Sequence, residues 1–222
     1  MRATRDLLRR RLHLVRKRGQ LLAHIQNTIH QYNLDPFGKR IAYPANREGL
    51  LEHFPDPAVR KSVEVDLALL ERLDALIADL ELTIVRHAKR HDADAFHRLR
   101  SVPGIGKILA LTLLYEIHDI TRFDRVQEFA SYARLVQCQK QSGGKTLGTG
   151  GAKMGNVHLK WAFSEAAVLF LRQTEGKKLI ARIEKQHGKG KALSILAHKI
   201  GRAVFYMLSR ETVFSMEKFL AA

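Results

Sequence analysis

The 222-residue sequence contains a single cysteine, Cys138. One cysteine cannot form an internal disulfide or supply a cysteine-rich zinc site, so we expect a protein of a reducing compartment. Long hydrophobic runs are also missing: no apolar stretch approaches the roughly 18 residues that a membrane span needs, and the first residues lack the apolar segment of a signal peptide. We therefore expect a cytoplasmic protein with no membrane partner.

Acidic residues are few beside basic ones. Lys and Arg total 38 and Asp and Glu total 22, so the formal net charge is +16. Hydrophobic residues make up 45% of the chain, which excludes a disordered basic tail. A globular chain this basic usually binds a polyanion, and nucleic acid is the commonest one, although a solvated charged surface or an anionic lipid surface would also account for the charge.

Proline is scarce and clustered: four of the five prolines lie between residues 34 and 58, which predicts a loop there. The preceding segment, up to Asn33, repeats apolar residues at helical spacing and contains one acid, Asp6, among many arginines. We expect an amphipathic helix whose basic outer face suits a phosphate backbone.

Residues 58–90 contain neither glycine nor proline. Their apolar residues recur at about 3.5 positions, the period of a coiled-coil seam. This pattern predicts a long helix that either pairs with a second copy, giving a homo-oligomer, or folds back on the first helix. Its acids are expected to face mostly away from the seam, which consists of Val63, Leu67, Leu70, Leu73, Ile77, Leu80 and Ile84.

The remaining residues predict a compact helical domain, so the fold class is mainly α. Only Leu135 to Lys140 suggests a short strand. The expected domains are a basic helix with its linker (1–57), the long helix (58–95) and a helical domain (96–222). Helices are expected at 107–118, 125–136, 155–173, 175–187 and 190–209.

The first sharp motif joins two apolar helical runs through Pro103, Gly104, Ile105, Gly106 and Lys107. This pattern is typical of a helix-hairpin-helix, in which glycines allow a tight turn and the second helix points its first amides at a phosphate. Such a contact positions DNA without reading its sequence. The alternative is a plain turn between helices.

The second motif runs from Gln141 to Asn156 and is rich in glycine and lysine. It is not a nucleotide-binding P-loop, because Gln139 stands where that loop requires its first glycine. Ser142, followed by Gly143, Gly144 and Lys145, could attack a phosphodiester, with backbone amides, Lys145 and Lys153 stabilising the charge of the transition state. The alternative is a flexible surface loop that only holds DNA phosphates.

A third helix is expected to begin near Gly155, with Asn156 as its N-cap and Lys160 adding a cation to its start. With the residues above, these three complete the expected DNA-binding set. Trp161 and Phe163 are interpreted as core residues. His87 and His91 have a spacing that metal ligands use, but a solvated helix end is the favoured interpretation, so no metal site and no cofactor are expected in this chain.

The motifs together resemble the C-terminal domain of bacterial insertion-sequence transposases that carry an N-terminal RuvC-like DEDD domain. The resemblance rests on the succession of Val102–Gly106, Leu114–Phe123, Phe129–Leu135, Ser142–Lys145, Lys153–Asn156 and Leu159–Ala162. It implies a recombinase in which a serine, here Ser142, forms a transient covalent link to DNA. It also implies multimers and, for some members, an element-encoded guide RNA.

The same resemblance implies about one hundred further residues before the first helix, holding four acidic ligands for Mg²⁺. We therefore expect an N-terminally truncated transposase, located at the nucleoid and inactive on its own. The rival hypothesis is a protein that binds DNA or RNA through the same segments without chemistry.

Overall fold

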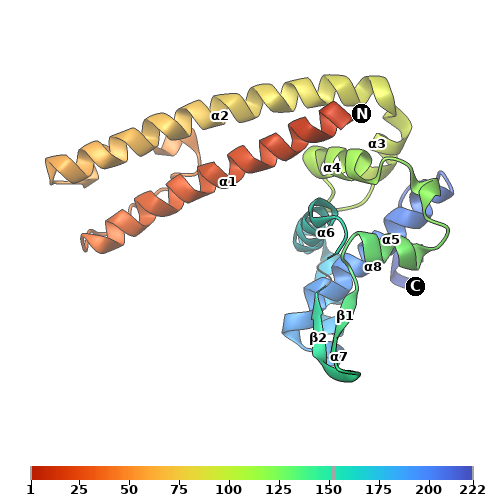
Figure 1. The fold of residues 1–222 in the computed structure, drawn as a ribbon. Helices are drawn as coiled ribbons and strands as arrows, with labels where there is room; N and C mark the ends of the chain where they lie inside the picture. Colours follow the sequence, from red (N-terminus) through yellow and green to blue (C-terminus); the bar gives the residue numbers. More distant parts are fainter. Residues whose placement is uncertain (1, 152–153, 222) are drawn as a thin grey trace. The chain divides into compact units, whose positions relative to one another are not determined.

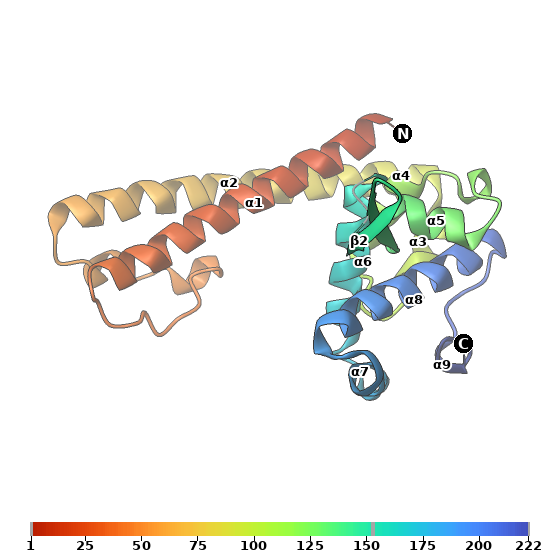
Figure 2. The same cartoon turned by 60° about the horizontal axis from the view of Figure 1, so that its bottom comes forward.

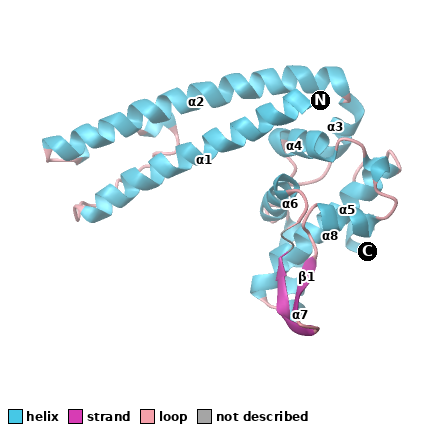
Figure 3. Ribbon diagram, viewed as in Figure 1, coloured by secondary structure: helices cyan, strands magenta, loops and turns pink. Residues whose placement is uncertain are grey.

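The computed structural model describes residues 2–151 and 154–221 (Figure 1). The chain divides into two compact units: a helical-hairpin unit, residues 6–85, and a C-terminal unit, residues 86–222 with the first five residues. Helices form nearly all of the regular structure in the described ranges (Figure 3), which confirms the mainly α fold class.

The helical-hairpin unit consists of two long antiparallel helices, α1 (Arg2–Gln31) and α2 (Pro57–His91), which run side by side in Figures 1 and 2. The connection contains two short 3-10 turns, η1 (Pro44–Asn46) and η2 (Leu51–His53). Asp56 begins α2, because its carboxylate accepts bonds from the amides of Ala58 at 2.8 Å and Val59 at 3.0 Å. Of the two expected partners for the long helix, this structure contains the first helix of the same chain.

The predicted seam of α2 faces inward. Val63, Leu70 and Ile84 are fully buried, and the other seam residues are partly buried. At the loop end of the unit, Ile25 of α1 joins Leu50 and Phe54 of the connection in one apolar cluster with Val63 and Leu70. Burial of these side chains is what holds two such long helices together.

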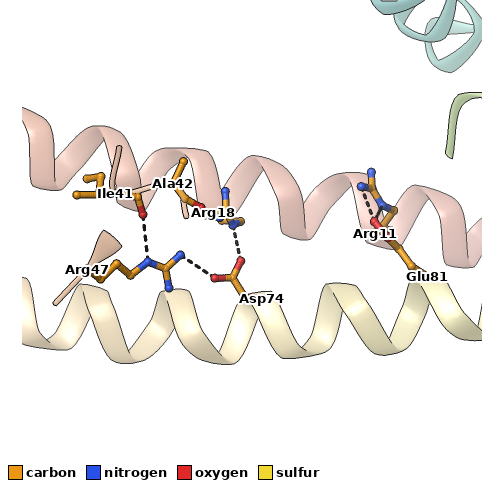
Figure 4. A network of polar contacts seen from close by, with 7 residues as sticks. All are labelled: Arg11, Arg18, Ile41, Ala42, Arg47, Asp74 and Glu81. Atoms are coloured by element: carbon orange, nitrogen blue, oxygen red, sulfur yellow. Dashed lines mark hydrogen bonds and ion pairs between the residues drawn. The ribbon is translucent and has the colours of Figure 1, made fainter. Parts of the chain in front are cut away.

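Ion pairs flank this seam and correct the expectation for the acids of α2. Asp74 binds Arg18 at 2.5 Å and Arg47 at 2.7 Å, and Glu81 binds Arg11 at 2.6 Å (Figure 4). Asp66 lies 2.5 Å from the His24 imidazole. These acids face the first helix because the antiparallel arrangement sets its basic side chains opposite them.

The C-terminal unit begins with α3 (Ala93–Arg100) and α4 (Lys107–Ile117), followed by η3 (Ile120–Arg122) and α5 (Val126–Tyr132). After a strand hairpin come α6 (Val157–Phe170), α7 (Thr174–His187), α8 (Lys189–Ser209) and α9 (Met216–Ala221). The core lies where α4, α5, α6 and α8 pack on one another. Its largest fully buried rings are Phe129, Phe163 and Phe170, which confirms Phe163 as a core residue; Trp161 is half-buried.

The glycine-rich segment is a strand hairpin rather than a loop. Strands β1 (Gln137–Ser142) and β2 (Lys145–Gly151) pair antiparallel, with Ser142 opposite Lys145. The predicted strand began two residues too early, because Leu135 still belongs to the turn that follows α5. Gly143 and Gly144 have φ of 55° and 75°, and positive φ at both central residues is what a two-residue hairpin turn requires.

Candidate nucleic-acid interface

The predicted helix-hairpin-helix consists of α3, a turn and α4. Val102 and Ile105 of the turn are buried, and the Ile105 amide donates to the Val102 carbonyl at 3.0 Å. Gly104 has φ of +88°, and a Cβ there would lie 2.5 Å from the Ala166 carbonyl oxygen and 2.7 Å from the Phe170 amide nitrogen. The turn therefore packs its second residue against the backbone of α6.

This packing changes which residues of the motif can contact a ligand. Gly104 and Ile105 are engaged with the protein interior, and Pro103 is half-buried. Gly106 and Lys107 are exposed, and Gly106 is the N-cap of α4 without a side-chain cap. The exposed part of this turn is thus a helix start beside an ammonium group, an arrangement that suits a phosphate.

The tip of the strand hairpin exposes Ser142, Gly143, Gly144 and Lys145 together. Nothing lies within 4 Å of the position that a Cβ would occupy at either glycine. The tip therefore presents a hydroxyl, open backbone and an ammonium group to solvent. Figure 1 shows this tip at the end of the hairpin that points away from α4, so the two glycine turns do not converge on one site.

Ser142 carries no activating neighbour in the part of the chain that the structure describes. Its hydroxyl makes no hydrogen bond to any described residue. A serine nucleophile is activated by an adjacent general base or by metal coordination. Lys153, the other lysine expected here, lies outside the described residues.

Asn156 holds the base of the hairpin to the core and begins α6. Its side-chain oxygen accepts from the amides of His158 at 2.9 Å and Leu159 at 3.1 Å, as expected of an N-cap. Its side-chain nitrogen donates to the Glu116 carboxylate at 2.8 Å, and its backbone amide donates to the Tyr132 carbonyl at 2.6 Å. The residue is 9% exposed, so its functional groups serve the fold.

Glu116, only 1% exposed, is the residue of this region that the sequence patterns did not single out. The available signal was an acid inside the otherwise apolar run of α4. Next to it, burial raises the pKa of Tyr132, but bonds from Asn156 and Arg122 outweigh burial and hold that pKa below its usual value. The Arg122 guanidinium also lies 4.5 Å from the centre of the Tyr132 ring.

Gly155 and Lys160 flank this anchor. Gly155 has φ of +104°, and a Cβ there would lie 2.5 Å from the Tyr132 carbonyl oxygen, so it too is a packing glycine. Lys160 is exposed one turn into α6. Of the described residues in the predicted set, those that are exposed are Gly106, Lys107, Ser142, Gly143, Gly144, Lys145, Gly155 and Lys160.

The basic face expected on the first helix is also reduced. Arg11 and Arg18 bind acids of α2, and Arg18 also donates to the Ala42 carbonyl (Figure 4). Arg10, Arg16 and Lys17 are exposed. The face that a phosphate backbone could contact is therefore narrower than the count of arginines suggests.

Within the described ranges, no three His, Cys, Asp or Glu side chains lie close enough together to hold a metal ion. No helix in the same ranges has both the length and the apolar character needed to cross a membrane.

Residues 96–183 match the family described as Transposase IS116/IS110/IS902. The matched segment begins in α3 and ends in α7, so it contains both glycine turns. The chain is similar to the transposase for insertion sequence element IS1111A of Coxiella burnetii, with 27% identity over 224 residues, 94% of this chain and 59% of the relative. It is also similar to the transposase for insertion sequence element IS1328 of Yersinia enterocolitica, with 29% identity over 139 residues, 60% of this chain and 42% of the relative.

Proposed function

We propose that the chain binds DNA and takes part in transposing an insertion sequence, because residues 96–183 match the family described as Transposase IS116/IS110/IS902. The observation that carries this proposal is the exposed hairpin tip, where Ser142, two open glycines and Lys145 stand together inside the matched segment. The chain spans 59% and 42% of the two relatives, so the activity of a whole transposase is part of the proposal.

Two exposed cationic turns would hold the DNA backbone. Lys145 lies across the tip from Ser142, and Lys107 begins α4 beside an uncapped helix start. Each offers an ammonium group next to backbone amides, a combination that recognises phosphate without regard to sequence. Lys160 adds a third exposed cation on α6.

The chemical step we propose is attack of the Ser142 hydroxyl oxygen on a DNA phosphorus. A serine–phosphate ester forms, one phosphorus–oxygen bond of the DNA backbone breaks, and a free DNA hydroxyl leaves. Lys145 would stabilise the added charge on the phosphate oxygens. The serine proton must leave to a group outside the described residues, and a RuvC-like domain supplied separately is the candidate that the family resemblance provides.

The alternative is a nucleic-acid-binding protein without chemistry. The observation that favours it is the lack of a base or hydrogen-bond partner at the Ser142 hydroxyl among the described residues. The same two turns would then hold DNA, or an RNA of the element, and Ser142 would be an ordinary polar residue of a hairpin tip.

A strand-joining assay separates the two functions. We expect joined products from the wild-type chain when a RuvC-like DEDD domain and Mg²⁺ are supplied, and none from Ser142→Ala. The control is Ser164→Ala, which removes an exposed hydroxyl from α6 of the same unit. DNA binding without joined products, with or without the added domain, would establish the binding function instead.

The backbone contacts are tested by salt dependence. Lys107→Gln and Lys145→Gln should each weaken binding to duplex DNA and reduce the slope of log affinity against log salt by about 0.9, one phosphate contact each. Lys185→Gln, an exposed lysine on α7, is the matched control. Equal losses in all three variants would mean that net charge, and not these two turns, governs binding.

We also propose that a second copy of the chain pairs along α2. Val65, Leu69 and Leu82 are about half exposed on this helix, away from the seam that packs on α1. Sedimentation of the wild-type chain should show a dimer that Leu69→Glu dissociates, whereas Ala68→Glu at the neighbouring exposed position should have a smaller effect. A monomeric wild-type chain would contradict this assembly.

A further inference from the structure

A cavity of about 680 Å³ lies between α8 and the chain that follows it. One wall is a single face of α8, where His198, Arg202 and Tyr206 recur at helical spacing. The other wall is the extended segment after α8 and the first turns of α9, including Phe214 and Lys218. The volume falls within the roughly 300–1,000 Å³ range of small-ligand sites.

The second wall is held in place by specific contacts. The Phe214 amide donates to the Ser101 hydroxyl at 2.9 Å, and Glu211 binds Arg98 at 3.4 Å. Phe219 is buried, with its ring 5.3 Å from those of both Phe170 and Phe214. The cavity is therefore built by anchored structure on both sides.

The cavity is cationic. Four cations, Lys199, Arg202, Arg210 and Lys218, line it beside His198, and none of its described lining residues is acidic. Glu211, next in sequence to Arg210, pairs with Arg98 instead. Burial lowers the pKa of Lys199 and Arg182 lowers it further, while burial and Arg202 lower the pKa of His198. An anion would relieve this concentration of positive charge.

Flat apolar groups stand beside these cations. The Arg210 guanidinium lies 4.8 Å from the centre of the Tyr206 ring, and the Lys199 ammonium lies 5.2 Å from that of Phe219. Tyr206 is partly exposed, and Val213 at the edge of the cavity is largely exposed. A ligand that suits this lining has a negative group and a planar ring within one small unit.

We propose that this cavity binds one unpaired nucleotide of a single-stranded nucleic acid, with its phosphate toward Arg202 and Lys218 and its base against Tyr206. Single-strand sites combine a cationic groove with aromatic side chains on which bases stack. A free phosphate would leave the aromatic wall unused, and a paired base would not expose its face to Tyr206. The proposal rests on the proposed nucleic-acid binding but uses residues outside both glycine turns.

The test measures binding of the full chain to fluorescein-labelled oligothymidylate and oligouridylate of about five nucleotides, and to a duplex DNA. We expect the double variant Arg202→Gln, Lys218→Gln to weaken single-strand binding about tenfold or more. The control, Lys185→Gln with Lys189→Gln, removes the same charge from exposed positions outside the cavity and should change binding by less than about twofold. The relative affinities of the two oligonucleotides tell which strand, DNA or RNA, the cavity prefers.

The aromatic wall has its own variants. Tyr206→Leu should weaken single-strand binding about fivefold or more, whereas Tyr206→Phe, which keeps the ring, should retain it. Equal losses in the two double variants, or unchanged binding in Tyr206→Leu, would overturn the proposal. If the wild-type chain binds duplex DNA through Lys145 while the cavity variants have no effect, the cavity proposal alone fails. If the chain binds oligonucleotides through the cavity but does not bind duplex DNA, only the proposed DNA contacts of Lys107 and Lys145 fail.

Discussion

In the helical-hairpin unit, Asp74 and Glu81 bind three arginines, whereas the cations along α8 of the C-terminal unit face a cavity with no carboxylate among its described lining residues. The first group of basic residues stabilises the fold. The second group is held near other cations and is available to an external anion.

The two units also differ in the contacts that supplement their apolar cores. Ion pairs lie along the seam between α1 and α2, while the C-terminal unit relies on close backbone packing at glycines such as Gly104 and Gly155. The cationic surface that nucleic acid can contact is therefore smaller than a net charge of +16 suggests. It also follows that removing a charge should destabilise the first unit, and adding a methyl group should destabilise the second.

The largest effect is expected at Gly104 of the C-terminal unit. Gly104→Ala places a Cβ within 2.7 Å of two backbone atoms of α6 at a residue with positive φ, so we expect a loss of about 3 kcal/mol or more in the free energy of unfolding. Urea denaturation followed by fluorescence of Trp161, the only tryptophan, reports on this unit.

The matched control is two residues away in the same turn. Gly106→Ala meets nothing within 4 Å, and Gly106 has φ of −76°, which alanine adopts freely. We expect its unfolding free energy to change by less than about 1 kcal/mol. Equal losses in the two variants would show that the turn is held by something other than the contact of Gly104 with α6.

The next largest effect is expected at Asp74 of the helical-hairpin unit. Burial would raise the pKa of Asp74, but bonds from Arg18 and Arg47 outweigh it and hold the pKa below its ordinary value of 3.8. Asp74→Asn leaves the buried Arg47 with less compensation and should cost about 2 kcal/mol near neutral pH.

The pH dependence of that loss is the sharper test. A lowered folded-state pKa means that the carboxylate stabilises the fold above its unfolded-state pKa and ceases to do so as pH falls through the folded-state pKa. The difference between wild type and Asp74→Asn, measured by far-ultraviolet circular dichroism in urea, should therefore shrink from neutral pH to about pH 3. A difference that is constant with pH would contradict a role for the charge.

The helices were predictable because their apolar periods and their glycine and proline boundaries are local properties of the chain. The seam from Val63 to Ile84 and the start of α6 at Asn156 needed no tertiary knowledge. The acids of α2 were misplaced because their direction depends on which helix packs alongside. Asp74 faces inward only because Arg18 and Arg47 stand opposite.

The candidate site was predictable only in part for a similar reason. Glycine spacing indicated one turn between helices and one loop, yet the sequence could not tell that Gly104 packs on α6 while Gly143 and Gly144 face open space. The cavity along α8 corresponds to no short motif in the sequence, because Arg202 and Lys218 come together only through the turn after α8. Residues joined by packing across the fold are invisible to a search for short patterns.

A smaller effect is expected at the open turn. Gly143→Ala meets no neighbour, but Gly143 has φ of +55°, so the substitution should cost about 1 kcal/mol, and Gly143→Asn should cost less because asparagine tolerates this conformation. Nuclear magnetic resonance of the hairpin amides measures the population of the turn. A loss as large as that of Gly104→Ala would mean that the tip packs on the protein and does not face solvent.

The smallest effect on stability is expected at Arg202, on the cavity face of α8. Arg202 is exposed, and none of the described residues that line the cavity with it is acidic, so its charge gains no ion pair there in the absence of an anion. Arg202→Gln should change the unfolding free energy by less than about 0.5 kcal/mol, or raise it slightly at low ionic strength where repulsion is least screened. Thermal unfolding of the wild type and the variant at about 0.05 M and about 0.5 M salt measures this. A loss of more than about 1 kcal/mol in the free energy of unfolding would mean that Arg202 stabilises the fold, as Arg18 and Arg47 do. The contrast between the cations of the two units would then not hold at Arg202.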